Sequence, residues 1–153
     1  MGIKPIEFCQ RIFMLQKTCE IRIKTKGRRL INITEEIKNF VKSSNIDLGL
    51  VNICILHTSA SLILQENASK DVLTDLVNFY DKLVPMNQVL YDHSLEGKDD
   101  MPAHIKTSLT NTNLTLSIVD GMLKLGVWQG IFLFEHRIDS HLRLVFCHII
   151  GKK

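Results

Sequence analysis

The sequence has few of the features that mark specialised protein classes. Its four cysteines include no CxxC pair, and no apolar run reaches the roughly 18 residues of a membrane-spanning helix. The opening residues, MGIKPIEFCQ, lack the charged and apolar blocks of a signal peptide. These absences argue against a zinc knuckle, a disulfide framework and a membrane partner, and we expect a cytoplasmic protein.

An excess of charge of one sign is also missing. Nineteen Lys and Arg side chains are opposed by sixteen Asp and Glu side chains, so the formal net charge is only +3. The basic residues are scattered, apart from short runs at 24–29 and at the C-terminus, and such runs are usually solvated surface. A nucleic-acid partner is therefore not expected.

The composition is that of an ordinary globular protein. Hydrophobic residues make up 45% of the chain and charged residues 23%, and 153 residues are enough for one domain with a real core. No internal repeat, low-complexity segment or linker rich in Gly, Ser and Pro divides the chain. We expect a single compact domain over residues 1–153.

Hydrophobic periodicity predicts helices set among hairpin-linked strands. Alternation predicts a strand over 18–25, and residues 6–15 form another β-rich stretch. Helical spacing predicts a helix from Thr34 to about Asn45, a longer helix that stops at Pro85, and a short helix over 103–110. This mixture indicates an α+β fold with two main helices and one short helix. Further strands are expected over 50–66 with a break at 57–61, and over 114–119, 122–127, 129–136 and 142–150.

The stretch YDHSLEGKDDMPAH, residues 91–104, is rich in side chains that can bind metal ions. Asp100 and His104 are four residues apart, so they project to the same side if a helix begins between them. His93 precedes them across a glycine turn, and the three side chains could converge on one ion with an open position, as in catalytic zinc sites. The structural alternative is that Asp99 or Asp100 caps the helix and both histidines are solvated.

A second candidate, LHTSAS, interrupts an apolar and β-branched run. If this stretch is extended, His57, Ser59 and Ser61 share one face. The chain has no GxSxG nucleophile elbow, which argues against a serine hydrolase. The imidazole, the hydroxyls and free backbone N–H groups at a strand break can instead hold an anionic oxygen. The alternative is that these polar groups only satisfy one another.

A third candidate is LGVWQGIFLFEHR, which contains the only tryptophan. Trp128 and its neighbour Gln129 lie between two glycines, which would let a ligand or another chain approach the backbone. Trp128 could equally belong to the core. Glu135 follows four apolar residues, and a carboxylate at the end of such a buried strand either pairs with a cation or has a raised pKa suited to proton transfer. Arg137 is the nearest candidate for that cation.

Three blocks of the chain resemble the signature blocks of the YjbQ family, called the secondary thiamine-phosphate synthase enzymes. They read HTSASLILQENASKDV, YDHSLEGKDDMPAHIKTSL and SIVDGMLKLGVWQGIFLFEHR, and their order and spacing match as well. The resemblance implies a compact α+β subunit dominated by antiparallel sheet and a homotrimer with polar pockets near the subunit boundaries. It also implies a His/Asp-rich site for a metal or an anion, and a thiamine phosphate synthase-like transferase activity of low efficiency on phosphorylated small molecules.

Together, the resemblance and the residue pattern assign roles to the candidate residues. We expect His93, Asp100 and His104 to bind a divalent metal, zinc or magnesium, or to bind an anion directly. His57, Glu135 and His104 are the candidates for general acid and base. The remaining expected ligand-binding residues are Thr58, Ser59, Glu66, Asn67, Glu96, Gly97, Asp99, Trp128 and Gln129.

The chain departs from the family pattern at two places. Val127 stands where the family usually has a threonine, and this change removes a hydroxyl. Ser69 and Lys70 stand where an acidic residue and a proline are common after Asn67. If that acid contacts substrate, the charge reversal at Lys70 changes specificity; if it caps a helix, Ser69 can replace it.

Few cations lie close in sequence to the expected site. Only Lys98, Lys106 and Arg137 are near it, whereas a diphosphate usually requires a cluster of Lys and Arg. This shortage counts against an efficient synthase. The alternative to an enzyme is a non-catalytic module that binds a small phosphorylated ligand or a metal ion.

Overall fold

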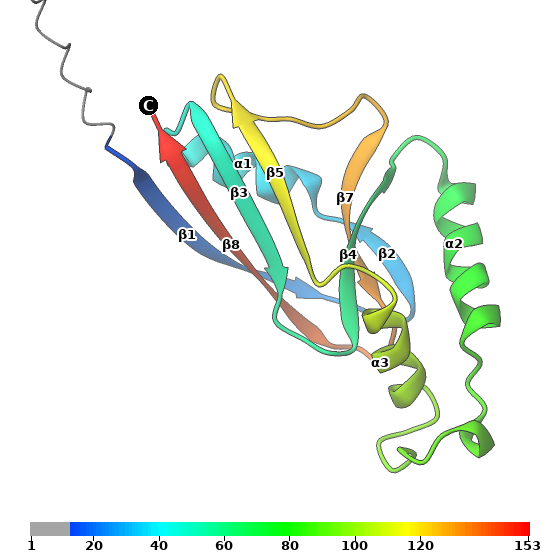
Figure 1. Cartoon of the computed structure of the whole chain (residues 1–153). Coiled ribbons are helices and arrows are strands. Elements are labelled where there is room, and N and C mark those ends of the chain that lie inside the picture. The colour runs from blue at the N-terminus through cyan, green and yellow to red at the C-terminus, as the bar shows by residue number, and fades with distance from the viewer. Residues whose placement is uncertain (1–12) are drawn as a thin grey trace, which may run out of the picture.

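The computed structural model describes residues 13–153, and the strands among these residues form two antiparallel sheets (Figure 1). The first sheet has the order β1-β8-β3-β5-β6, and the second has the order β2-β7-β4. The α+β fold with mainly antiparallel sheet is thereby confirmed. The strands are β1 (Leu15–Lys24), β2 (Arg29–Asn32), β3 (Leu48–Ile55), β4 (Ala60–Glu66), β5 (Asn113–Val119), β6 (Met122–Leu123), β7 (Gln129–Glu135) and β8 (Leu142–Lys152), and the helices are α1 (Thr34–Ser44), α2 (Lys70–Leu83), the 3-10 helix η1 (Gln88–Leu90) and α3 (Asp100–Ser108).

One hydrophobic core joins both sheets and α1. Along β8, every second side chain is buried, including Val145, Cys147 and Ile149. They belong to the same cluster as Ile53 of β3 and Leu133 of β7. Full burial of an aliphatic side chain contributes about 1.5–3 kcal/mol relative to exposure, so this cluster is what holds the two sheets together.

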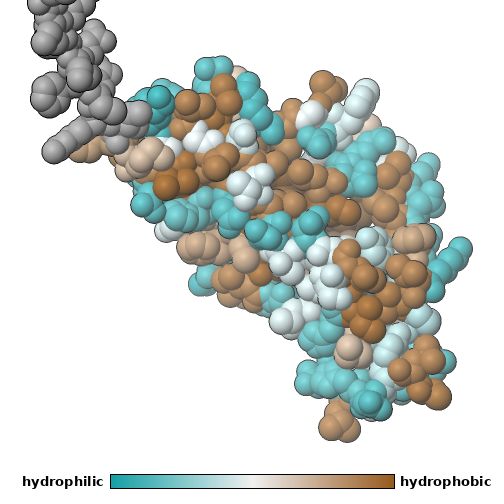
Figure 2. Space-filling model, viewed as in Figure 1, coloured by the Kyte–Doolittle hydropathy of each residue, from teal (hydrophilic) through white to brown (hydrophobic). Residues whose placement is uncertain are grey.

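The helix α2 and the segment after it form an arm beside the sheets (Figure 1). α2 contacts β2, has no fully buried residue and ends at Leu83, two residues before the predicted stop at Pro85. The chain then passes through η1, where Val89 is 92% exposed, and through Leu95, which is 99% exposed. Figure 2 shows apolar side chains at the tip of the molecule below α2 and α3. His93 lies on this segment, so the arm brings it to α3.

Two short strands differ from the expected pattern. β2 was not predicted, because four residues beside a basic run are too few to show an alternation; its partner is β7. A strand was expected over 122–127, but β6 contains only Met122–Leu123, because its pairing with β5 extends over two residue pairs. The chain from 124 to 128 instead crosses to the second sheet, where β7 begins.

The helix α3 begins at Asp100, three residues before the predicted start, and this brings Pro102 into its first turn, where a proline is tolerated. Most of the β-rich stretch predicted over 6–15 lies outside the described residues. Among the residues that are described, no helix is both long enough and apolar enough to cross a lipid bilayer.

Candidate functional site

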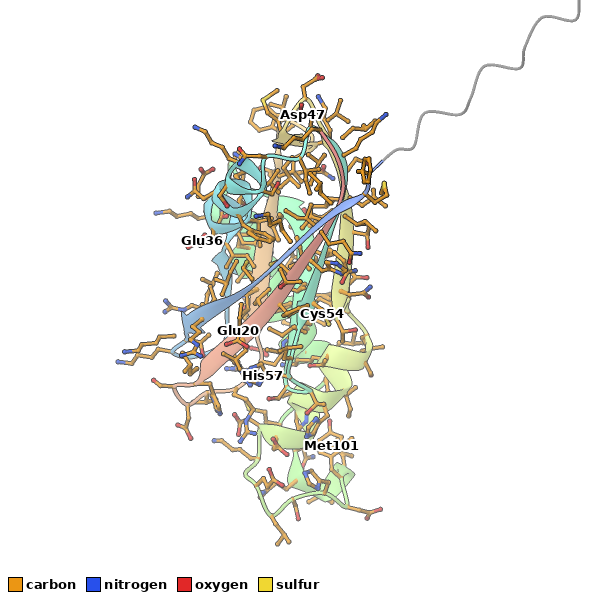
Figure 3. The ribbon with its side chains drawn as sticks, turned by 90° about the vertical axis from the view of Figure 1, so that its left-hand side faces the viewer. Glu20, Glu36, Asp47, Cys54, His57 and Met101 are labelled. Atoms are coloured by element: carbon orange, nitrogen blue, oxygen red, sulfur yellow. The ribbon has the colours of Figure 1, made fainter. Side chains whose placement is uncertain are left out.

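Two parts of the chain that are distant in the sequence meet at one end of the molecule. One is the loop before α3 together with the first turns of α3, and the other is the connection between β3 and β4. Figure 3 shows His57 in that connection on the same side of the molecule as Met101 of α3, whereas Asp47 lies at the opposite end of β3. The site therefore lies where β3 ends, β4 begins and α3 starts.

His93, Asp100 and His104 form the predicted cluster. Each offers one ligand atom, and these atoms all lie within 4.8 Å of one another. Asp100 Oδ2 is 2.8 Å from His93 Nε2 and 3.3 Å from His104 Nε2. The Asp100 side chain is buried, whereas the side chains of His93 and His104 are 45% and 32% exposed. The carboxylate thus forms the floor of the cluster, and the imidazoles leave one side open to solvent.

The backbone near Thr58 orients one of these histidines. His104 Nδ1 lies 2.9 Å from the carbonyl oxygen of Thr58. Because a carbonyl oxygen can only accept, Nδ1 must carry the proton, and the lone pair of the neutral ring is then on Nε2, which faces Asp100. A hydrogen bond of this kind is what orients metal-binding histidines in proteins. Thr58 therefore contacts the cluster through its main chain.

Arg137 holds the acidic side of the cluster. Its Nη1 pairs with Asp100 Oδ1, its Nε is 3.1 Å from Asp99 Oδ2, and its Nη2 donates to the carbonyl oxygen of Glu96 at 3.0 Å. Burial acts to raise the pKa of Asp99, but the backbone N–H of Ile138 and the charge of Arg137 overcome this effect and lower that pKa below its usual value. The Asp99 carboxylate is thus held as an anion.

The same arrangement corrects the structural alternative for this stretch. Asp99 stands at the N-cap position of α3, but neither its side chain nor that of Asp100 caps the helix, because both carboxylates turn to Arg137. Gly97, which was expected to bind ligand, has a φ of 110°, a conformation that favours glycine. It makes the turn that carries the chain from Glu96 into this network.

Glu135 does not have the raised pKa that proton transfer would require. It is fully buried, and its oxygens lie 2.5 Å from Arg143 Nη2 and 2.7 Å from Arg143 Nε. Thr25 Oγ1 and the backbone N–H of Arg137 also donate to it, at 2.6 and 2.9 Å. Burial alone would raise the pKa of Glu135, but these partners lower it. Its cation is Arg143, and the side chain of Arg137, which was suggested for this role, binds elsewhere.

Sequence reasoning missed Arg143, although a signal was present. Alternation along β8 places Arg143 on the same face as Val145, Cys147 and Ile149, so the pattern predicts that this charged residue is buried. Besides Glu135, its guanidinium donates to the hydroxyl and the carbonyl oxygen of Ser59, at 3.1 and 3.3 Å. Ser59 is therefore bound to this buried ion pair.

His57 is also engaged by the backbone. Its Nε2 accepts a hydrogen bond of 2.8 Å from the backbone N–H of Leu144. Burial, followed by the charge of Arg143, lowers the pKa of His57 below its ordinary value, so the ring is neutral near pH 7. Because the lone pair of Nε2 is occupied, His57 does not fit the expected role of general base at that atom.

Four residues that the resemblance assigned to the pocket lie at the other end of the second sheet. Glu66 pairs in register with Gln129, six residue positions along β4 from the pair formed by Ala60 and Glu135. Asn67 donates its backbone N–H to the carbonyl oxygen of Trp128 at 2.9 Å. A strand rises about 3.3 Å per residue, so this group lies roughly 20 Å from the His57 end within one chain.

The two departures from the family pattern have simple surroundings. Ser69 caps α2, because its hydroxyl accepts a hydrogen bond of 3.3 Å from the backbone N–H of Asp71. Ser69 therefore takes the capping role, and Lys70 follows it as an exposed first residue of the helix. Val127 is exposed as well.

A second group of buried polar residues was not predicted. His136 is buried, with Nε2 2.9 Å from Ser61 Oγ, and Ser61 is fully buried and not part of an open hydroxyl face. Lys106 of α3 is buried too, and its Nζ is 2.5 Å from Asp81 of α2. Asp81 in turn pairs with Arg28 at 2.6 Å. These contacts tie α3 to α2 and fix the helix that carries the cluster.

The chain is similar to proteins of one family over almost its whole length. The family model described as UPF0047 protein YjbQ-like matches residues 19–152. The UPF0047 protein sll1880 of Synechocystis is 50% identical over 130 residues, which are 85% of this chain and 88% of that protein. The UPF0047 protein YjbQ of Escherichia coli O157:H7 is 40% identical over 138 residues, or 90% of this chain and 98% of that protein.

Solved structures agree with these similarities. A YjbQ/UPF0047 family protein of Clostridium acetobutylicum is 34% identical and matches with a TM-score of 0.77, covering 86% of this chain and 98% of that one. A YbjQ-like protein of unknown function from Sulfolobus solfataricus has a TM-score of 0.85 at 22% identity, covering 92% of this chain and all of that one, and so shares the fold. From the family model and these relatives, the chain belongs to the YjbQ-like UPF0047 family.

Proposed function

We propose that His93, Asp100 and His104 bind a divalent metal ion that in turn binds the phosphate group of a small phosphorylated molecule. One observation carries this proposal: two imidazole nitrogens and one carboxylate oxygen lie within 4.8 Å of one another. Mixed nitrogen and oxygen donors favour zinc, whereas magnesium prefers oxygen ligands and water. Three protein ligands with one open side are typical of a catalytic zinc site, since structural zinc sites have four.

The surrounding residues suit this role. Arg137 engages Oδ1 of Asp100, which leaves Oδ2 directed at the two imidazoles. The carbonyl oxygen of Thr58 fixes the ring of His104 with Nε2 as the available nitrogen. Partners of this kind typically account for a 10–100-fold effect on metal affinity. The ligand set is therefore oriented before any ion arrives.

A zinc ion held there would supply a Lewis acid for a phosphate oxygen. Glu96 is the residue that best suits proton transfer on the open side. Its Oε1 is 4.0 Å from His93 Nε2, and its side chain is 68% exposed, so it can accept a proton from water or from a substrate hydroxyl. His57 and Glu135 are less suitable, because each is already held by other groups of the protein.

The available charge favours a ligand with a single phosphate group. A synthase-like transfer would need cations to bind the leaving diphosphate. Arg137 and Arg143 are each bound to carboxylates, and Lys106 is buried against Asp81. Lys98 is exposed beside the cluster and adds one positive charge. We therefore restrict the proposed substrate class to phosphate monoesters, and we do not extend the proposal to thiamine phosphate synthesis.

Elemental analysis of protein purified without chelator tests the metal site. Near-stoichiometric zinc is expected in the wild type and should be lost in His93→Ala and in His104→Ala. His148→Ala is the matched control, because His148 is a histidine on β8 that bonds Gln16 at 2.9 Å, away from the cluster. A wild type that takes up no metal after zinc is added, or variants that retain it, would refute the proposal.

Turnover distinguishes an enzyme from a binding module. Glu96→Gln should keep the zinc content while lowering the rate of phosphate release from a monoester such as p-nitrophenyl phosphate. If the wild type binds zinc and the ester but releases no phosphate above the buffer background, the site is a binding module without catalysis.

We also propose, in line with the resemblance, that the protein forms a homotrimer. Apolar side chains on adjacent strands of the first sheet support an interface: Leu50 and Ile150 pair across β3 and β8, and Phe146 lies on the same outer face. Sedimentation equilibrium should give three times the chain mass of 17.5 kDa for the wild type and a smaller mass for Phe146→Glu. A wild-type monomer would contradict the proposal.

A further inference from the structure

A groove of about 590 Å³ lies between β2 and the first three turns of α2. It is separate from the histidine cluster, since the two share no residue. Its volume falls within the range of about 300–1,000 Å³ that is usual for small-molecule sites. The residues that define its chemistry are Arg28, Arg29, Lys70, Leu30, Leu73 and Val77.

The groove is positively charged. Arg28, Arg29 and Lys70 line it, and none of its lining residues is acidic. Asp81 lies behind it, but this carboxylate faces both Arg28 at 2.6 Å and Lys106 at 2.5 Å, so it does not neutralise the groove. Within residues 13–153, neither Arg29 nor Lys70 forms an ion pair with an acidic side chain. A ligand can therefore reach two exposed cations and one that is held in place.

Arg28 is prepared for such a ligand. Its Nη1 is bound to Asp81, which orients the guanidinium and still leaves most of its five N–H donors for another acceptor. Lys70 is the first residue of α2, so its charge adds to the positive end of the helix dipole. Asp81 lies near the C-terminal end of α2, about 16 Å along the helix from Lys70, so the Arg28 guanidinium lies at the end of the groove opposite to Lys70. Its remaining N–H groups and the neighbouring Arg29 are well suited to phosphate oxygens.

The rest of the groove is apolar. Leu30 of β2 and Leu73 and Val77 of α2 are half-buried along it, and the last two lie four residues apart on one face of the helix. Inorganic phosphate would leave this surface uncovered. An apolar group attached to the phosphate would bury it and gain the corresponding hydrophobic contribution.

We propose that this groove binds a small organic phosphate, in which a phosphate group contacts Arg28 and Arg29, a compact apolar body packs on Leu30, Leu73 and Val77, and Lys70 adds positive charge at the far end. This site is additional to the proposed metal site and does not depend on it. Its occupancy stabilises the contact between α2 and β2.

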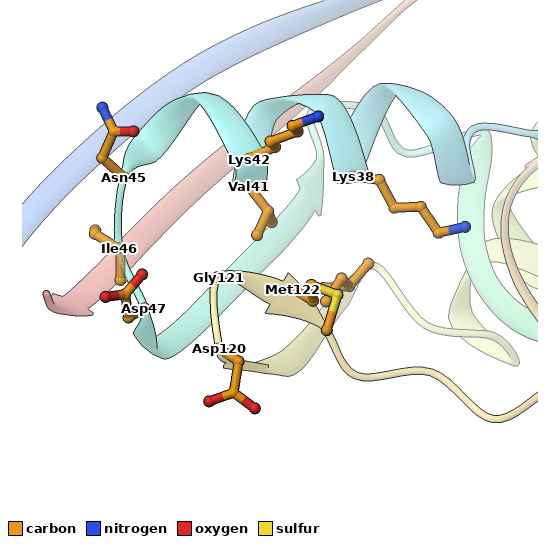
Figure 4. A pocket seen from close by; sticks show the side chains of 10 residues that line it. Lys38, Val41, Lys42, Asn45, Ile46, Asp47, Asp120, Gly121 and Met122 are labelled. Atoms are coloured by element: carbon orange, nitrogen blue, oxygen red, sulfur yellow. The ribbon is translucent and has the colours of Figure 1, made fainter.

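A second hollow shows why charge matters to this choice. It lies between α1 and the turn from β5 to β6, with a volume of about 610 Å³ (Figure 4). Lys38 in this hollow pairs with Glu35 at 2.9 Å, and Asp47 and Asp120 add negative charge to the lining. This hollow does not favour an anion. Lys42, which lines it, therefore provides a matched control position.

NMR titration of the full chain with phenylphosphonate tests the proposal, because this stable analogue combines a doubly charged phosphonate with an apolar ring. Backbone amide signals of residues 28–30 and 70–78 should shift together and saturate. The double variant Arg29→Ala/Lys70→Ala should weaken binding about tenfold or more, as expected for the loss of charge-assisted hydrogen bonds. Lys42→Ala should leave the affinity unchanged, and inorganic phosphate should bind more weakly than phenylphosphonate.

Several results would overturn the proposal. These are no saturable shift at these amides, equal affinity of the wild type and the double variant, or shifts confined to residues 93–104. The last result would concern the metal site alone. A change in the sedimentation of the double variant would instead assign the groove to contacts between copies of the chain, and this outcome also counts against a small organic phosphate.

Discussion

His136 should make the stability of the protein depend on pH in a narrow and testable range. Its imidazole is buried, packs on the ring of Phe134 with a centroid distance of 4.3 Å, and shares a 2.9 Å hydrogen bond with Ser61. Its Nδ1 has no hydrogen-bond partner among the described residues. Burial, together with the nearby charge of Lys106, lowers the pKa of His136 from 6.5 to about 3. The folded protein therefore keeps this ring neutral.

The sign and size of the effect follow from the two pKa values. In the unfolded chain His136 binds a proton below pH 6.5, whereas in the folded protein it does so only near pH 3. Above pH 6.5 the ring is neutral in both states, so it does not change the free energy of unfolding. As the pH falls from 6.5 towards 3, only the unfolded chain binds the proton, and the free energy of unfolding therefore falls progressively. Each pH unit is worth about 1.4 kcal/mol, so roughly 1.5 units, down to about pH 5, should remove ~2 kcal/mol.

Urea unfolding of the wild type and of His136→Gln measures this difference. Glutamine can still bond Ser61 but does not titrate. Between about pH 7.5 and 5, the free energy of unfolding of the wild type should fall by ~2 kcal/mol more than that of the variant. This window lies above the range in which Asp99 and Glu135 take up protons, because both have lowered pKa values. His57 contributes equally to both proteins and cancels.

The reasoning would be refuted by parallel pH profiles for the wild type and His136→Gln. It would also be refuted by an NMR titration of the wild type in which the His136 ring becomes protonated near pH 6.5. Either result would mean that water or a polar partner reaches Nδ1, so that burial does not penalise the charged ring.

Three further variants test the networks around the site. Arg143→Met leaves the charge of Glu135 buried without its partner, so the free energy of unfolding should fall by about 3–5 kcal/mol in urea; a loss below about 1 kcal/mol would show that the pair is solvated. Arg137→Lys keeps a positive charge but not the fork that binds Asp100, so calorimetry should find zinc affinity reduced about tenfold, and an unchanged affinity would contradict the orienting role. Gly151→Ala places a methyl group against neighbouring backbone in the first sheet, so thermal unfolding monitored by circular dichroism should show a loss of about 1–3 kcal/mol, and an unchanged midpoint would contradict this packing.

Local features were readable from the sequence because their causes are local. Alternating residues predicted the wet face of β1, and Pro85 marked the end of α2. The histidine cluster was accessible for the same reason. His93, Asp100 and His104 lie within twelve residues, and a glycine turn followed by the start of a helix is enough to bring them together.

The partners of these residues were not readable, because they come from strands far away in the sequence. His104 is oriented by a carbonyl 46 residues away, and Asp100 is bound by Arg137, 37 residues away. The chain contains several cations and carboxylates of similar local appearance, and sheet register decides which of them meet. That is why Arg137 was the nearest candidate for pairing with Glu135 in the sequence, although the partner is Arg143.

By itself, the sequence determined an α+β fold with mainly antiparallel sheet and the identity of the His/Asp cluster. Only the tertiary structure decided which polar groups are free to act on a ligand. Glu135, His57 and Ser61 have the right chemistry for catalysis, but burial and long-range hydrogen bonds already occupy them. A buried polar group needs a partner, so the packing of strands against α3 turned these three residues into structural ones and left the cluster open.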